Sequence, residues 1–207
     1  MINRTSVSDF QERVKGMMSE KRYKHTLGVM EMAERIGFFC LSDKINELLA
    51  AALLHDVAKE FSDTELCEII KGNYDNSEEI IGYGREIWHS YAAPYVVKRD
   101  FPIFATENIL SAVQKHTLGA PDMSVFDEII FISDYVEAGR TYPSCAVVRD
   151  YLYQAFEADK QDKNIDVLHK ACIMSIEYTE ENLKSRGKGV CPVSLLAKNA
   201  LKSKIKY

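Results

Sequence analysis

The sequence predicts an all-α protein with one bundle of helices. Apolar residues recur at helical spacing along almost all of the 207 residues, and alternation with a period of two is hard to find. Apolar residues make up 46% of the chain and charged residues 28%, which is typical of a folded globular protein. Because two domains of equal size would each be small for independent folding, we expect a single domain over 1–207.

Capping patterns and helix breakers divide the chain into segments. Ser8 with Gln11, and Ser62 with Glu65, are capping-box patterns that predict helix starts. The segment 72–84 is expected to be a connection between helices. The expected helices cover about 8–20, 27–39, a third through the apolar run 48–54, 62–72, 87–98, 106–116, 126–138, 146–158 and 165–183.

The last part of the chain differs from the rest in composition. We expect the domain core over about 10–185, followed by a Lys-rich segment over about 190–207. This segment is weakly amphipathic and carries Lys198, Lys202, Lys204 and Lys206, so it is interpreted as a solvated terminal helix, with a minor role in contacting a partner or substrate as the alternative.

Charge and hydropathy exclude several classes of protein. The formal net charge of −5 argues against binding of a nucleic acid polymer, which depends on many lysines and arginines. The longest apolar run has seven residues, far short of the roughly 20 of a membrane span. The N-terminus lacks the apolar stretch of a secretion signal, and the five cysteines form no C-x-x-C pair. We therefore expect a cytoplasmic protein without disulfides; the sequence leaves open whether it is a homodimer.

Histidines and aspartates on separate expected helices form the chemically informative pattern. His55 and Asp56 follow a buried apolar run, and an imidazole beside a carboxylate offers nitrogen and oxygen ligands that suit iron, manganese or zinc. Alone, such a dipeptide is more often part of a surface turn. Four further residues of these types lie on other helices, and helices packed as a bundle can direct such side chains toward one metal site. These four are His25, His89, His116 and Asp134.

The short sequence segments around these residues resemble those of a known family. They are Arg22-Tyr-Lys-His25-Thr-Leu-Gly28, Leu54-His55-Asp56-Val-Ala-Lys59, Trp88-His89-Ser90, Lys115-His116-Thr117-Leu-Gly119 and Ser133-Asp134-Tyr-Val-Glu137-Ala138-Gly139-Arg140. Their order resembles the HD superfamily of metal-dependent phosphohydrolases, and within it the YqeK-type symmetrical dinucleoside tetraphosphatases, over about residues 10–185. Ala138 and Ser90 depart from that branch, which usually has Pro and Gly there.

The resemblance implies an HD-domain helical bundle with a metal site in its core. It also implies hydrolysis of diadenosine tetraphosphate into two ADP molecules, at a di-iron centre held by the six residues. The residue types themselves favour two metal ions over one, because six ligands are too many for one tetrahedral ion. Manganese or another transition metal would also suit these ligands.

The simplest arrangement divides the six ligands between two metal ions. His25, His55, Asp56 and Asp134 would hold the first, and Asp56 would bridge to a second ion held by His89 and His116. Asp56 therefore has a catalytic role in this arrangement. The nucleophile would be a hydroxide between the metals, since metal binding lowers the pKa of water from about 15.7 toward about 7.

Four residues near the ligands are expected to contact the substrate. Lys59 follows His55 by four residues, so on a helix it would share the face of the ligands and touch a phosphate, with a catalytic role. Arg140 is expected to bind a second phosphate through its guanidinium, and Arg22 is a weaker candidate for the same task. Thr117 is expected to shape the pocket wall. His169 is interpreted as a surface or satisfied core residue.

Other functions use related residues and stay open as alternatives. A guanosine tetraphosphate hydrolase would carry a Glu-Asp pair shortly after His55-Asp56, where this chain has Val57-Ala-Lys-Glu-Phe61, and a cyclic-dinucleotide phosphodiesterase would carry a Gly-Tyr-Pro signature. Another nucleotide phosphohydrolase, a di-iron oxygenase or a non-catalytic nucleotide sensor would fit the same ligand set. Lys59 and Arg140 favour a phosphate substrate over oxygen chemistry.

Overall fold

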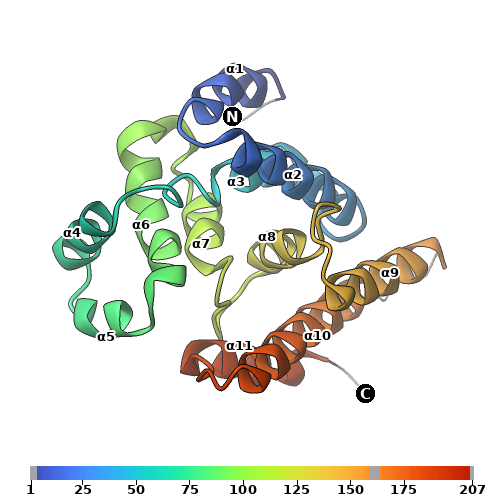
Figure 1. Ribbon diagram of the computed structural model, residues 1–207. Helices are drawn as coiled ribbons and strands as arrows, with labels where there is room; N and C mark the ends of the chain where they lie inside the picture. The colour runs from blue at the N-terminus through green and yellow to red at the C-terminus, as the bar shows by residue number, and fades with distance from the viewer. Residues whose placement is uncertain (1–3, 159–163, 206–207) are drawn as a thin grey trace.

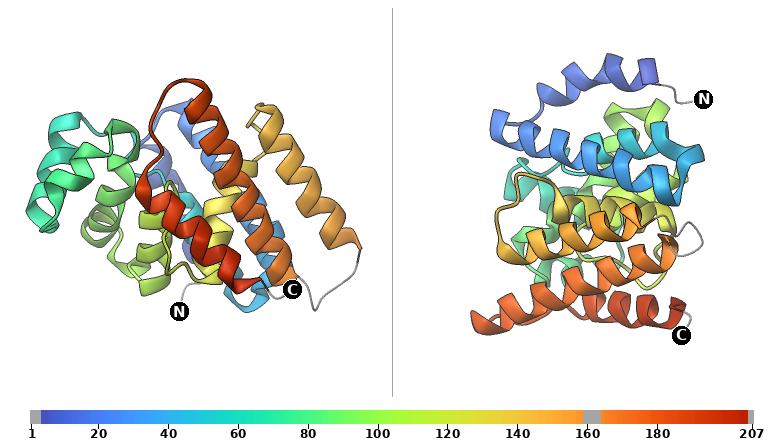
Figure 2. Two further views of the ribbon diagram at one scale, coloured as in Figure 1. Left: turned by 90° about the horizontal axis from the view of Figure 1, so that it is seen from below. Right: turned by 90° about the vertical axis from the view of Figure 1, so that its right-hand side faces the viewer.

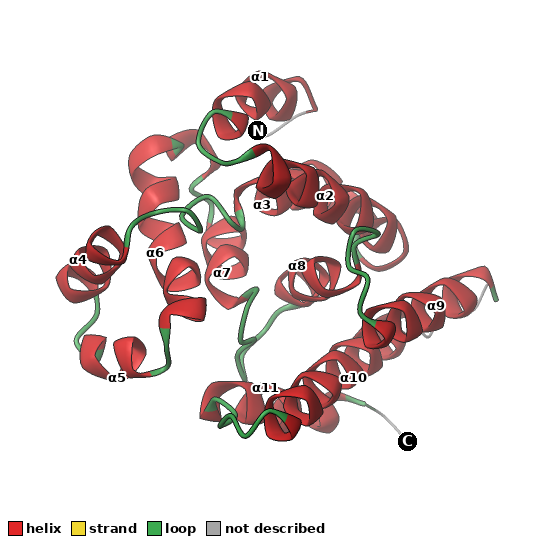
Figure 3. Ribbon diagram, in the orientation of Figure 1, coloured by secondary structure: helices red, strands yellow, loops and turns green. Residues whose placement is uncertain are grey.

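The computed structural model describes residues 4–158 and 164–205, in which every regular element is a helix (Figures 1 and 3). The expectation of an all-α fold is confirmed. None of these described helices combines the length and the apolar character that crossing a bilayer requires. The α-helices are α1 (Arg4–Lys15), α2 (Glu20–Cys40), α3 (Ile45–Leu54), α4 (Asp63–Asn73), α5 (Ser77–Gly82), α6 (Arg85–Asp100), α7 (Glu107–Lys115), α8 (Val125–Val136), α9 (Pro143–Glu157), α10 (Asn164–Ser185) and α11 (Pro192–Lys204).

Two central helices are buried along most of their length. The apolar run 48–54 of α3 is buried throughout, and so is 126–133 of α8. Helix α8 packs against α2, α7 and α10, while α3 packs against α2 and α7. A helix that is covered on all faces belongs to the core, and the surrounding helices build outward from these two. Figure 2 shows the resulting layers, from α1 on one side to α10 and α11 on the other.

Side-chain caps define where several helices begin. Ser62 and Glu65 form the expected capping box at the start of α4, and Thr106 accepts a hydrogen bond from the Ile109 amide at the start of α7. A further capping box, formed by Ser124 and Asp127, starts α8. The capping box of Ser124 and Asp127 fixes where α8 begins, and so fixes the position of Asp134 along this helix.

Three expectations about local structure are wrong. The first helix covers Arg4–Lys15 rather than 8–20, so Ser8 lies inside this helix and not at its start. The expected connection 72–84 contains α5, a helix of six residues that has no side-chain cap to announce it. Lys59 does not lie on a helix, because α3 ends at Leu54 and a series of tight turns continues to Phe61.

The Lys-rich C-terminal segment is not a solvated helix. Helix α11 buries Ala197 and Leu201 and packs against α10. Its lysines are paired with carboxylates of the layer beneath. The pairs are Lys198 with Glu180 at 2.5 Å, Lys202 with Glu177 at 2.8 Å and Lys204 with Glu128 at 2.8 Å. Lys206 lies outside the described residues. Since α11 is anchored in this way, it forms a fixed wall beside the site described below.

Candidate metal centre

Six side chains converge between α2, α3, α6, α7 and α8. Four of them are buried, and the other two, His25 and Asp134, are 13% and 19% exposed. They come from places up to 109 positions apart, so only the packing of the five helices brings them together. The six are His25 on α2, His55 and Asp56 directly after α3, His89 on α6, His116 directly after α7 and Asp134 on α8.

Asp56 lies in the middle of this cluster and faces a different pair of histidines with each oxygen. Its Oδ2 is 3.7 Å from Nε2 of His25 and 3.5 Å from Nε2 of His55. Its Oδ1 is 3.2 Å from Nε2 of His89 and 3.6 Å from Nε2 of His116. A carboxylate in this position can bridge two cations, each also within reach of imidazole nitrogen.

Two groups of ligand atoms are close enough to hold a metal ion each. The first comprises His25, His55 and Asp134, with Oδ1 of Asp134 3.0 Å from Nε2 of His25. The second comprises His55, Asp56 and His116. His55 therefore belongs to both groups, whereas the sequence suggested that it holds only the first metal. Nε2 of His25 and Nε2 of His55 are buried without a hydrogen bond, which is costly unless a cation binds there. The residues present fit a metal centre.

The orientation of two histidine rings is set by the ends of their own helices. Nδ1 of His55 lies 2.6 Å from the carbonyl oxygen of Ala52, and Nδ1 of His116 lies 2.8 Å from that of Val113. Because a carbonyl only accepts, each Nδ1 carries the hydrogen and each Nε2 presents its lone pair to the cluster. This is the tautomer that binds a metal through Nε2.

The electrostatics keep most of these groups in the form that binds metal. Burial opposes the charge of Asp56, yet His55 and the other histidines hold its pKa well below the usual range. Burial lowers the pKa of His89 to about 3 and also lowers that of His116, against the effect of Asp56. Burial opposes the charge of His55 as well, but Asp56 raises its pKa overall.

Three cations surround the cluster. Nη1 of Arg22 is 2.6 Å from Oδ2 of Asp56, and Nη2 of Arg140 is 2.6 Å from Oδ1 of Asp134. Nζ of Lys59 is 3.2 Å from both ring nitrogens of His89, and burial lowers its pKa. The turn after α3 thus directs Lys59 toward the histidines, although this segment is not helical. All three cationic groups contact the cluster, so an anion bound beside the cluster would be within their reach.

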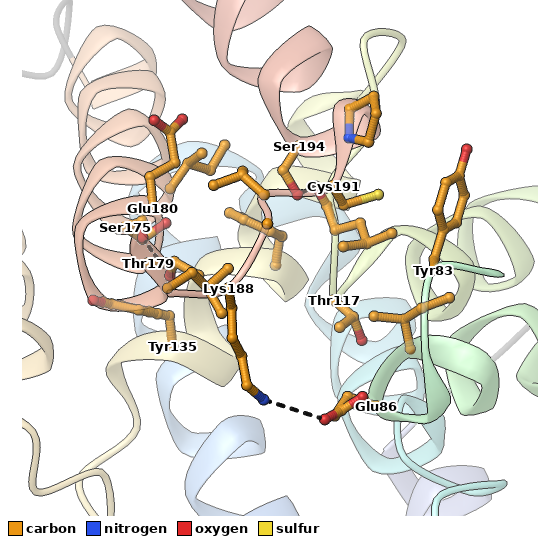
Figure 4. A pocket seen from close by; sticks show the side chains of 18 of the residues that line it. Tyr83, Glu86, Thr117, Tyr135, Ser175, Thr179, Glu180, Lys188, Cys191 and Ser194 are labelled. Carbon is orange, nitrogen blue, oxygen red and sulfur yellow. Dashed lines mark hydrogen bonds and ion pairs between the residues drawn. The ribbon is translucent and has the colours of Figure 1, made fainter. Parts of the chain in front are cut away.

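A cavity of about 720 Å³ opens beside the cluster and reaches α10 and α11 (Figure 4). Its lining includes His116, Thr117 and Asp134, together with the aromatic residues Tyr83 and Tyr135. Oγ1 of Thr117 lies 3.0 Å from Nε2 of His116 and 3.3 Å from Nε2 of His89, so this hydroxyl contacts both histidines where the cavity meets the cluster. The volume falls within the range of small-molecule sites.

A second cavity of about 300 Å³ shares Asp134 and Tyr135 with the lining of the first. Arg140 and Tyr142 line it, and Arg186 lines both cavities. The two cavities therefore meet at Asp134, next to the cluster.

Comparison with known proteins identifies the family. The family model of the HD domain matches residues 22–139, which contain all six clustered side chains. The chain belongs to the HD-domain family. The expected family is thereby confirmed, and this HD-domain chain is a hydrolase that depends on divalent metal ions.

One relative matches the HD-domain chain over nearly its whole length, and another over about two thirds of it. It is 33% identical over 194 residues to a protein of Bacillus subtilis (strain 168) named "Bis(5'-nucleosyl)-tetraphosphatase, symmetrical", covering 92% of this chain and 94% of that protein. A protein of the same name from Halalkalibacterium halodurans is 36% identical over 136 residues, covering 66% and 71%.

A solved structure supports the same relationship for the fold. It is the crystal structure of a "predicted HD superfamily hydrolase involved in NAD metabolism" from Clostridium acetobutylicum, 28% identical in sequence. The two structures agree with a TM-score of 0.79 over 96% of this chain and 97% of that chain. The arrangement of helices around the cluster is therefore shared with an experimentally determined member of the superfamily.

Sequence reasoning overlooked three residues at the site of the HD-domain chain. Glu137 lies within hydrogen-bond distance of His25, but its place in the motif 133–140 gave no sign of this contact. Arg186 and Lys188 line the large cavity from the segment between α10 and α11. Lys188 lies 3.9 Å from Glu86 across the cavity (Figure 4). Their spacing from the HD motifs gives no signal, because only the packing of α10 brings them there. His169 is buried and satisfied by Glu128 at 2.6 Å, one of the two roles expected.

Proposed function

We propose that this HD-domain chain cleaves dinucleoside tetraphosphates symmetrically, converting diadenosine tetraphosphate into two ADP molecules. The proposal rests on one observation: the two carboxylate oxygens of Asp56 face separate pairs of histidines, beside a cavity large enough for a nucleotide. The names of the relatives from Bacillus subtilis and Halalkalibacterium halodurans support the substrate.

The proposed cofactor is a pair of divalent metal ions, with iron favoured and manganese or another transition metal as the alternative. The ligands would be His25, His55, Asp56, His89, His116 and Asp134, with Asp56 bridging and His55 near both ions. Imidazole and carboxylate ligands suit iron, manganese and zinc. When bound, such a pair supplies an activated water and neutralises charge on the phosphates.

The cations of the chain would hold the polyphosphate over this centre. The charge of Lys59 is disfavoured by burial, so a phosphate oxygen beside it would restore its stability. Arg140 reaches from Asp134 toward the small cavity, and Nε of Arg22 is buried without a hydrogen bond and is free to donate one. Thr117 would limit how deeply the substrate enters the large cavity. These residues place phosphates near the ligand cluster and exclude bulk water from it.

Symmetrical cleavage requires room for a nucleoside diphosphate on both sides of the reacting bond. The two cavities meet at Asp134 and Tyr135, so a polyphosphate crossing the cluster would extend into both. Tyr135 contributes to both walls and would contact one of the bases through its ring. We propose that the partner of this site is a small nucleotide substrate and not a nucleic acid polymer or a membrane. We also propose a cytoplasmic location, and a homodimer is compatible with this site.

The proposal is tested by identifying the products. Protein loaded with Fe²⁺ or Mn²⁺ is incubated with diadenosine tetraphosphate, and the nucleotides are separated by ion exchange. Two ADP molecules are expected; ATP with AMP would overturn symmetrical cleavage, and an unchanged nucleotide that still binds would indicate a sensor. An equal rate under anaerobic conditions would exclude an oxygenase.

A further inference from the structure

Glu137 is buried against His25, although it belongs to neither group of metal-binding atoms. Its Oε1 lies 3.1 Å from Nδ1 of His25, and its side chain is 5% exposed. Nδ1 is the ring nitrogen opposite to the one that faces Asp134. A carboxylate at this distance accepts the hydrogen of Nδ1, which leaves Nε2 to bind a cation.

The other oxygen of Glu137 is held by the main chain. Oε2 accepts a hydrogen bond of 2.6 Å from the amide of Gly139. The loop that provides this amide is fixed in turn by the guanidinium of Arg149. It donates to the carbonyl oxygens of Val136, Glu137 and Arg140 at 2.5, 2.6 and 3.1 Å. The carboxylate is therefore anchored independently of His25 and can fix the ring.

Two glycines provide the space for this carboxylate. A Cβ atom at Gly28, three residues after His25 on α2, would lie 2.5 Å from Oε2 of Glu137. A Cβ atom at Gly139 would lie 2.9 Å from the same oxygen. Neither glycine has a positive φ, so backbone conformation does not require them. A side chain at either position would therefore have to displace the carboxylate.

We propose that Glu137 is a positioning residue of the metal centre, which orients His25 through Nδ1, and that Gly28 and Gly139 serve to admit its carboxylate. The inference rests on the proposed role of His25 as a metal ligand. His55 and His116 obtain the same orientation from main-chain carbonyls. Among these three histidines, His25 is the one whose ring depends on a side chain.

Replacing Glu137 by Gln tests this role, because an amide has only one accepting oxygen and cannot serve both His25 and Gly139. Titrating metal-free protein with Mn²⁺ in a calorimeter should show that Glu137→Gln weakens binding by roughly 10–100-fold at one of two sites. With diadenosine tetraphosphate, kcat should fall at limiting Mn²⁺ and recover in excess Mn²⁺, with KM little changed.

Glu128→Gln is the matched control for this experiment. Glu128 is also a buried carboxylate that accepts from a histidine, His169, at 2.6 Å, but it lies outside the cluster. This variant should bind Mn²⁺ as the wild type does. Equal loss of affinity in both variants would overturn a specific role of Glu137.

Gly28→Ala separates positioning from folding. Alanine forms helices better than glycine, so the substitution should not harm α2 itself, while its methyl group should displace the carboxylate. We expect a loss of Mn²⁺ affinity similar to that of Glu137→Gln, with little further loss when both are combined. Wild-type affinity in both single variants, or loss of cooperative thermal unfolding together with affinity, would overturn the inference. If the wild type itself bound no Mn²⁺, the proposed metal centre would fail as well.

Discussion

The guanidinium of Arg22 is hydrogen-bonded to Asp56, with Nη1 2.6 Å from Oδ2. That oxygen also faces His25 and His55, so Arg22 and a metal ion would compete for it. The side chain of Arg22 is 28% exposed, so a phosphate in the site would reach it from solvent. In the proposed function, this contact would couple metal binding to substrate binding at one atom of Asp56.

Arg22→Gln is therefore expected to affect the two kinds of binding in opposite directions. Loss of the competing cation should strengthen Mn²⁺ binding by about tenfold, or about 1.5 kcal/mol, the scale of a hydrogen bond to a charged group. The KM for diadenosine tetraphosphate should rise, since a phosphate contact is lost. Calorimetry with Mn²⁺ and steady-state kinetics check the two effects; weaker metal binding would show that Arg22 supports Asp56 instead of competing.

The central position of Asp56 predicts different metal stoichiometries for two variants. Asp56→Ala should lose both metal ions and all measurable turnover, because both of its oxygens are removed from the cluster. His89→Ala should keep one metal ion per chain, at His25, His55, Asp56 and Asp134, and lose turnover by more than about 100-fold. Elemental analysis of the purified variants measures the stoichiometry. Two ions in Asp56→Ala would show that it does not bridge.

Glu47 predicts a pH dependence of stability away from the site. Burial opposes its charge, but hydrogen bonds from Thr106 and Asn108 and the charge of Lys44 lower its pKa overall. A carboxylate with a lowered pKa in the folded state contributes stability above its unfolded pKa and loses it as the pH falls through the folded value. Glu47→Gln should thus cost about 1 kcal/mol at pH 7, and the difference from the wild type should vanish in acid. Urea unfolding of the metal-free protein between about pH 3 and pH 7, the range in which carboxylates titrate, checks this prediction. A difference in unfolding free energy between variant and wild type that stays constant with pH would contradict it.

The contacts of Lys204 indicate that this residue anchors the C-terminal helix α11 to the rest of the protein. Its ammonium group lies 2.8 Å from Glu128, whose carboxylate is fully buried, and also donates to the carbonyl oxygen of Met123. Lys204→Met should lower the free energy of unfolding by about 2 kcal/mol, since the buried carboxylate keeps only His169. Mn²⁺ affinity should not change. Urea denaturation measures the loss, and unchanged stability would mean that α11 is held by its apolar contacts alone.

The sequence predicted long periodic elements well and short or irregular ones poorly. The run 48–54 was recognisable as part of the core because seven consecutive apolar residues leave a helix without a polar face for solvent. The helix Ser77–Gly82 was missed, since six residues without a side-chain cap carry little periodicity. Lys59 was placed on a helix because the sequence does not show that α3 ends at Leu54.

The convergence of the six candidate ligands was predictable because they have the residue types of metal sites and recur on separate amphipathic segments. The supporting contacts were not. Glu137 and His25 are 112 positions apart, and their hydrogen bond depends on how the end of α8 passes α2. Likewise, the lysines of α11 looked solvated because their partners on α8 and α10 are identified only by tertiary packing.

The acceptors of His55 and His116 are main-chain carbonyls of Ala52 and Val113, so ordinary substitutions at these two positions leave the acceptors in place. Mutation can change the side chains there without turning either ring. The acceptor of His25 is a side chain and can be lost or replaced in a single step. Attempts to redesign this centre for another metal should therefore begin around His25, where one change adjusts a ligand without altering the course of a helix.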